Sequence, residues 1–402
     1  MSSFKKRYEK KELVILSIML LVFCVTKVIR GSNVNSSTNG GIWNYISLGY
    51  YPVFFLLLYK RKSFKTNGLF ISLLIYATMA MLISIPTILT GSMNINSLYN
   101  LFMVPYSVVV LYCFYLASDD SVIPQRIIII AFIICLIINL YNVIRFKIGG
   151  AERALASDIY FSLTLFPFCL LIVKNKMIKI TCIVGMFLAA FISAKRTAFI
   201  AFVISIILYV IVVEHNKGSG AFRILKLLLV LLGVLLFLYY VSEYIDTYYN
   251  LGLYKRLNGL QEDGGGGRQG IYEQIFTAYL ESPWYNKLFG HGMFETLNLC
   301  GFMAHDDFLE VLYDYGIIAF MSFVSFFLAL FKKGVDLVRQ KSEYAPSFVA
   351  SIVIGLLLSL FSFMMVYFTY VTCISAFWGY VLGLENNNKR NELLGEDYLD
   401  GL

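Results

Sequence analysis

Charged residues are scarce in this sequence of 402 residues: Asp, Glu, Lys and Arg make up 14% of it, whereas 59% of the residues are hydrophobic. A soluble domain usually has roughly a quarter of its residues charged. The shortage therefore excludes an ordinary soluble protein. Together with a mean hydropathy of +0.72, it indicates an all-α polytopic membrane protein.

Cysteine pairs and a leader cleavage site are also missing. Of the seven cysteines, only Cys300 falls in a predicted loop, and there is no CxxC spacing, so neither a disulfide framework nor a cysteine metal site is expected. The first hydrophobic segment follows a basic start, but the stretch SNVNSSTNGG after it has no small-x-small cleavage pattern. We expect a retained membrane anchor.

The net charge of +8 is distributed in short clusters between apolar runs, which is the positive-inside pattern of membrane proteins and not the basic face of a nucleic-acid-binding protein. Membrane lipid is therefore an expected partner and nucleic acid is not. The clusters are Lys5, Lys6, Arg7, Lys10 and Lys11; Lys60, Arg61, Lys62 and Lys65; Lys174, Lys176 and Lys179; and Lys332, Lys333, Arg339 and Lys341.

Apolar segments long enough, or nearly so, to cross a membrane predict about twelve transmembrane helices within one integral membrane domain, residues 1–402. With both termini in the cytoplasm, every basic cluster above falls on the cytoplasmic side, and no internal repeat is evident. The predicted segments are 13–29, 43–59, 68–90, 97–117, 126–144, 157–173, 177–194, 198–213, 224–241, 306–330, 345–366 and 368–384.

The largest external feature is a loop over residues 242–304, between the ninth and tenth predicted helices. Within it, GGGG is followed by RQGIYEQIFTAYLES, an amphipathic pattern that predicts a helix ended by Pro283.

Lys195 and Arg196, in the stretch SAKRTAF, lie between two hydrophobic segments with almost no polar loop around them. A cation at the membrane centre costs about 2.5 to 3.5 kcal/mol on insertion scales. Either these side chains extend to the lipid head groups from a tight hairpin, or they bind an anion at the outer face. Arg suits the second role, because its planar group holds two phosphate oxygens at once. Arg153 and Arg268 are predicted on the same side, with Arg268 at a helix N-terminus that also favours anions.

His305 opens the stretch AHDDFLEVLYDYG, directly before an apolar segment. Asp306, Asp307 and Glu310 could orient its imidazole and raise its pKa, which would suit an acceptor of a hydroxyl proton. A helix cap or a satisfied polar residue is the alternative. A metal site built from the histidine and its two aspartates is a further alternative, although adjacent residues on a helix point in different directions.

These motifs, in this order and with this sidedness, resemble those of the O-antigen polymerase and O-antigen ligase family. His305 is followed eleven residues later by Gly316, with Leu309 and Leu312 between them. Upstream are a Gly-Arg pair, an aromatic helix, a Ser-Pro pair and GHG; SAKRTAFIAF and ERALASDIYFSLTLFPF complete the series. The motifs span residues 150–330.

The resemblance implies a C-type glycosyltransferase architecture without metal or other cofactor. It implies transfer of a growing glycan from undecaprenyl diphosphate to a hydroxyl of another lipid-linked repeat unit, at the periplasmic face of the bacterial cytoplasmic membrane. Arg196 would hold the diphosphate and His305 would take or guide the proton. A chain-length regulator protein is an additional possible partner. The remaining expected substrate-binding residues are Arg153, Lys195, Arg268, Asp306 and Glu310.

Other functions stay open. The ligase pattern prefers Asn, Ser or Gln where this chain has Asp306, which favours a polymerase over a ligase of finished surface polymer. A flippase or transporter would be expected to have charges within several central helices and an internal repeat. A scaffold without catalysis is the remaining alternative.

Overall fold

The computed structural model describes residues 2–31, 47–61, 68–90, 102–103, 105–148, 158–193, 195–218, 229, 233, 240, 243–244, 268–362, 364 and 368–399. All regular structure in these ranges is helical. The segment predicted at 224–241 lies almost entirely outside the described residues, as do Arg153 and the GGGG run.

Every other predicted segment overlaps with a helix, although α2 and α5 begin 7 and 9 residues later than the predicted segments 43–59 and 97–117. In chain order the helices are α1 (Ser2–Gly31), α2 (Tyr50–Arg61), α3 (Gly68–Thr90), α5 (Tyr106–Ala117), α6 (Val122–Ile148), α7 (Ile159–Ile172), α8 (Lys176–Ile192), α9 (Arg196–Asn216), α12 (Arg268–Glu281), α13 (Trp284–Phe289), α14 (Glu295–Cys300), α15 (Asp307–Arg339), α16 (Ala345–Phe361) and α17 (Phe368–Leu399).

Five helices of the described chain are long and apolar enough to cross a membrane, and α5, α7 and α16 are shorter apolar helices. The protein is therefore all-helical in the described residues and multi-pass in character. The number of twelve spans and the cytoplasmic location of both termini stay predictions. The five candidate spans are Lys11–Ile29, Gly68–Pro86, Val122–Arg145, Arg196–Asn216 and Asp307–Arg339.

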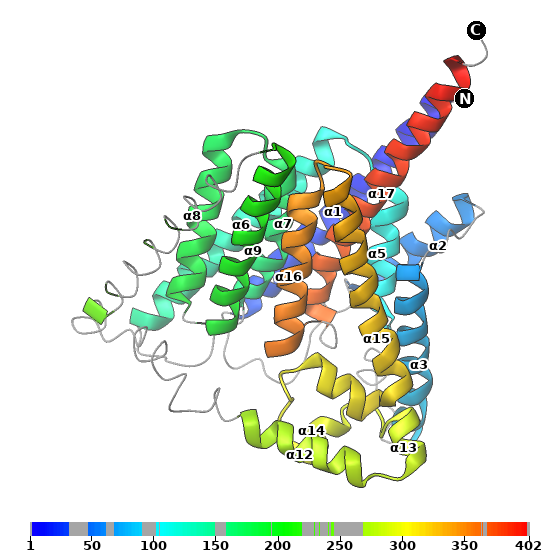
Figure 1. Cartoon of the computed structure of the whole chain (residues 1–402), viewed down its shortest axis with the longest axis vertical. Coiled ribbons are helices and arrows are strands. Elements are labelled where there is room, and N and C mark those ends of the chain that lie inside the picture. Colours follow the sequence, from blue (N-terminus) through cyan, green and yellow to red (C-terminus); the bar gives the residue numbers. More distant parts are fainter. Residues whose placement is uncertain are drawn as a thin grey trace.

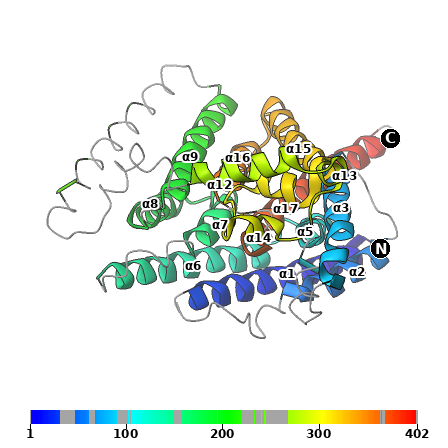
Figure 2. The same ribbon diagram turned by 90° about the horizontal axis from the view of Figure 1, so that it is seen from below.

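The helices α12, α13 and α14 form a cap on one end of the bundle, whereas the start of α1 and the end of α17 extend from the opposite end (Figure 1). Seen from the capped end, α12 crosses the ends of α16 and α15, and α13 lies near α3 (Figure 2). The cap packs on the bundle through α15, which contacts all three of its helices. The predicted loop helix is confirmed as α12, and Pro283 ends it by serving as the N-cap of α13.

The centre of the bundle is α17, which packs most extensively on α5. A Cβ added at Gly379 would lie 2.0 Å from the carbonyl oxygen of Leu111, and one at Gly383 would lie 2.3 Å from that of Tyr115. These two glycines, four residues apart, let the two helix backbones approach closely, as small residues do between membrane helices. The part of α17 around Gly379 and Gly383 is thereby held in the core.

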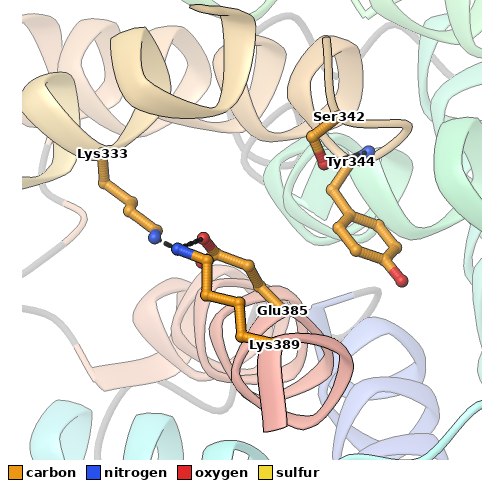
Figure 3. A network of polar contacts seen from close by, with 5 residues as sticks. All are labelled: Lys333, Ser342, Tyr344, Glu385 and Lys389. Atoms are coloured by element: carbon orange, nitrogen blue, oxygen red, sulfur yellow. Dashed lines mark hydrogen bonds and ion pairs between the residues drawn. The ribbon is translucent and has the colours of Figure 1, made fainter. Parts of the chain in front are cut away.

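A charged network fixes the end of the bundle opposite the cap (Figure 3). Glu385 of α17 forms ion pairs with Lys333 of α15 and, at 2.9 Å, with Lys389 of α17. Because Glu385 is 7% exposed, its charge depends on these partners. The network joins α15 to α17 far from the cap.

Candidate active site

Three helices meet at the last carbonyl of α16, beneath the cap. The oxygen of Phe361 accepts hydrogen bonds from Nη1 of Arg268 at 2.6 Å and from Oγ1 of Thr197 at 3.3 Å. Arg268 is the first residue of α12 and Thr197 lies in the first turn of α9. The two sequence motifs, 71 residues apart, are thus brought together.

Lys195 and Arg196 begin α9 at the same junction. Lys195 is the N-cap of the helix, and its Nζ lies 5.9 Å from the ring centre of Tyr160. The hydroxyl of Tyr160 lies near the side chains of Thr197 and Ser362. Arg196 is partly buried, with its Nη1 shielded from solvent. Lys195 therefore packs beside an aromatic ring that has polar neighbours, and Arg196 is partly buried next to it. This differs from a simple exposed hairpin.

The amphipathic pattern of α12 places Arg268. Ile271, Ile275 and Ala278 face a small apolar cluster that includes Ala304 and Tyr313, so α12 is held against the start of α15. One turn after Arg268, Tyr272 hydrogen-bonds with the guanidinium. Burial, with the charge of Asp306, raises the pKa of Tyr272, while Arg268 opposes that rise.

His305 adopts a left-handed backbone conformation, with φ of 58°. This conformation is uncommon for a residue other than glycine, and it persists only where the surroundings enforce it. Glu310, which is 1% exposed, lies near the backbone N–H groups of Ala304 and His305, but neither of its buried carboxylate oxygens has a hydrogen-bond partner among the described residues. The buried carboxylate thus lies beneath the turn that presents His305.

The pKa of His305 is lowered to about 4, first by burial and then by the positive charges of Arg268 and Lys195. The expectation that the neighbouring carboxylates raise this pKa was wrong. The physical reason is that the imidazole is partly buried and the charges that act on it are cationic, whereas Asp306 and Asp307 accept hydrogen bonds from backbone N–H groups. His305 is consequently neutral at pH 7 and can accept a proton, although as a weak base.

Asp306 is the N-cap of α15. One of its oxygens accepts hydrogen bonds from the N–H groups of Phe308 and Leu309 at 2.9 and 3.1 Å. Asp307, which is fully buried, accepts from the N–H of Met364 at 2.9 and 3.2 Å. The first aspartate therefore starts the helix, and the second joins it to the chain just after α16.

Gly316 breaks α15, which the sequence predicts as continuous. With φ of 75° and ψ of 177°, it adopts a conformation essentially restricted to glycine. The break leaves the carbonyls of Tyr313 and Asp314 to accept from the N–H groups of His291 and Gly292 at 3.1 and 3.0 Å. The cap is thus bound to α15 by backbone hydrogen bonds at the break.

His291 strengthens this attachment. Its Nδ1 lies 3.0 Å from the carbonyl oxygen of Tyr313, its Nε2 lies 2.8 Å from Oγ of Ser282, and its ring stacks on that of Tyr313 at 4.1 Å. The carboxylate of Asp314 accepts from the N–H and hydroxyl of Thr296 at 2.8 and 2.7 Å. His291 therefore fixes the cap, and His305 is the histidine at the junction.

The junction is suited to an anion. The helices α9 and α12 present their N-termini there, where the helix dipole favours negative charge. The first N–H groups of α15 are already bonded to Asp306. Lys195 and Arg268 both act electrostatically on His305. Among the described residues, no group of three His, Cys, Asp or Glu side chains could hold a metal ion. The donors that are present can bind an anion beside a neutral imidazole.

The structure brings most, but not all, of the site residues predicted from the sequence together. Lys195, Arg268, His305, Asp306 and Glu310 converge, Arg196 begins the helix at the same junction, and Arg153 lies outside the described residues. Sequence reasoning missed Tyr160, Tyr272 and the carbonyl of Phe361. Aromatic residues are too frequent in this chain for their number to reveal the first two, and a backbone carbonyl has no sequence signal.

Part of the chain matches a known protein family. Residues 181–324 match the family model described as O-antigen ligase; no curated protein matches the chain. The matched segment includes α9, the cap and the first half of α15, and so most of the junction. This confirms the resemblance noted from the motifs and supports an enzyme of glycosyltransferase type. Over residues 181–324, the chain is therefore similar to the O-antigen ligase family.

Proposed function

We propose that the protein is a polymerase of lipid-linked oligosaccharide repeat units. It would transfer a growing glycan from undecaprenyl diphosphate to a hydroxyl of another lipid-linked unit, at the periplasmic face of the cytoplasmic membrane. The observation that carries the proposal is the junction itself, where Lys195 and Arg268 flank the neutral imidazole of His305.

Each group has a role in this reaction. A diphosphate leaving group gains negative charge as the sugar bond breaks, and fixed cations stabilise that charge. Arg196, Arg268 and Lys195 would hold the diphosphate, with the N-termini of α9 and α12 adding to the positive potential. Arg153 stays a predicted contributor. His305 would accept the proton of the attacking hydroxyl, since it is neutral at pH 7. The activated diphosphate bond already supplies the driving force.

A ligase of finished surface polymer is the second candidate. The matched family model has that description, and Asp306 no longer argues against it. Asp306 acts as the N-cap of α15, and Asn, Asp and Ser are nearly equivalent at that position. The difference between Asp here and Asn or Ser in ligases therefore carries no information about the acceptor.

The phenotype of a deletion strain separates the two candidates. Loss of a polymerase leaves single repeat units attached to the final acceptor, whereas loss of a ligase leaves none attached. In the same strain, we expect plasmid-borne Arg196→Ala and His305→Ala to give no polysaccharide ladder. Arg339→Ala, at the exposed far end of α15, is the control that should restore it. A full ladder from both normally expressed site variants would refute the proposed site.

A further inference from the structure

The short helix α13 exposes an unusual amount of aromatic surface. Trp284, Tyr285 and Phe289 are 71%, 52% and 46% exposed, and the rings of Trp284 and Tyr285 meet edge to face at 6.1 Å. A contiguous exposed apolar surface of this kind marks a contact with a partner or with a membrane.

The depth of α13 relative to the bilayer follows from its contact with α15. The apolar run of α15 ends at Phe331, directly before Lys332 and Lys333. A hydrocarbon core of about 30 Å takes about 20 helical residues, so its other edge falls near residue 311. Gly316 then lies about 7 Å inside that edge, at 1.5 Å per residue.

The end of α13 touches α15 at this depth. A Cβ added at Gly316 would lie 2.4 Å from the carbonyl oxygen of Leu288 and 2.5 Å from the nitrogen of Gly290. Non-helical backbone is tolerated at such a depth only where its polar groups are satisfied within the protein. The hydrogen bonds of His291 and Gly292 to α15 do this. Hence the end of α13 that meets Gly316 lies within about 7 Å of the boundary between hydrocarbon and head groups.

An exposed apolar surface on α15 begins next to the point where the end of α13 contacts that helix. Ile318 and Met321, exposed on α15, follow directly after Gly316 within a candidate span. Trp and Tyr are the residues that favour the membrane interface, because their rings have an apolar body and a polar tip. Lys287 of the same helix supplies a cation for lipid phosphates.

We infer that α13 is an interfacial helix, with Trp284, Tyr285 and Phe289 covered by bilayer lipid at the level of the head groups. It would anchor one end of the cap in the membrane, while Arg268 at the other end completes the junction. A partner protein on the same face, or exposure to water, would be a different outcome of the test.

The test uses the fluorescence of Trp284 in the full chain reconstituted into single-copy lipid nanodiscs. Subtracting the emission of Trp284→Phe isolates this residue from Trp43 and Trp378. We expect lipid brominated near the head group to remove most of this emission, lipid brominated near the chain end to remove less, and aqueous iodide to leave it nearly unchanged. Met321→Trp, made in the Trp284→Phe background, is a reference that should reverse the order of the two lipids.

Two results would overturn the inference. Quenching by iodide and not by brominated lipid would show that α13 faces water. Quenching by neither reagent would show that protein covers Trp284. In both cases the Met321→Trp reference establishes that the brominated lipids reach the protein, and similar thermal unfolding of the variants establishes that they are folded.

Discussion

At the scale of single residues, the account depends on a histidine that is difficult to protonate. His305 is partly buried beside two cations, and its pKa is about 4, compared with about 6.5 in an unperturbed peptide. The neutral form, which can accept a proton, is therefore dominant at every pH well above 4.

This gives a prediction for the pH profile of the transfer rate. If His305 is the proton acceptor, activity should fall with acidification only near pH 4 and not near 6.5. Arg268→Gln removes one of the charges that lower this pKa, so the pKa rises and the acid limb moves to higher pH. The measurement is the relative rate of each protein across pH, normalised to its own maximum. An acid limb near 6.5 in the unmodified protein, unchanged by Arg268→Gln, would contradict the prediction.

Asp306 allows a structural role to be distinguished from a chemical one. As the N-cap of α15 it should be replaceable by Asn, which caps equally well without a charge. Asp306→Asn should therefore retain both thermal stability and glycan transfer, whereas Asp306→Ala should lose about 1 kcal/mol of stability. If Asp306→Asn is as stable as the unmodified protein but inactive, the carboxylate has a chemical role that the cap does not explain.

At the scale of elements, the break in α15 decides how the cap is attached. Gly316 has a glycine-only conformation and meets the backbone of Leu288 and Gly290, so Gly316→Ala both strains the chain and pushes the cap away. We expect a loss of at least about 2 to 4 kcal/mol, from overpacking and backbone strain together.

Gly301→Ala is the matched control for this effect. Gly301 also has a positive φ, of 72°, but an added Cβ there would meet nothing within 4 Å. Its cost should be about 1 to 2 kcal/mol, from backbone conformation alone, with little change in transfer activity. Thermal unfolding and glycan transfer should be measured for both variants. Equal effects of the two substitutions would show that the contact at the break does not attach the cap.

The helices α12 and α15 show which features of the fold could be predicted from the sequence and which could not. Hydropathy and Pro283 were sufficient to predict α12 and most of the bundle, because apolar periodicity and helix ends are local signals. The order of several motifs, the spacing from His305 to Gly316 among them, gave the resemblance to the family whose model matches residues 181–324. Gly316 nevertheless lies within an apolar run that is typical of an unbroken helix. The break there depends on the hydrogen bonds of His291 and Gly292, which come from a distant segment. The pKa of His305 was mispredicted for the same reason, since it is lowered first by burial in the folded chain and then by Arg268 and Lys195, which come from other segments.

At the scale of the whole molecule, the ion pairs of Glu385 lie at the end of the bundle opposite the junction. Glu385→Gln removes the charge that pairs with Lys333 and Lys389. Because Lys389 is half exposed, we expect a modest loss of about 1 to 3 kcal/mol, below the range for breaking a fully buried pair. Transfer by the folded protein should be unchanged.

The double variant Lys333→Met with Glu385→Leu is the companion measurement, since apolar replacement of a buried ion pair is often neutral. It should recover much of the thermal stability lost in Glu385→Gln. A variant of this network that keeps its unfolding temperature but loses transfer activity would mean that the two ends are coupled.

The most direct test of the account is chain lengthening by the purified protein in liposomes, supplied only with lipid-linked repeat units. The unmodified protein and Arg339→Ala should produce a ladder of longer glycans. Arg196→Ala, Arg268→Ala and His305→Ala should each be slower by about 100-fold or more, the range for removing a group that stabilises developing charge. Full lengthening by these three folded variants would contradict the claim that cations gathered beside His305 carry out the transfer.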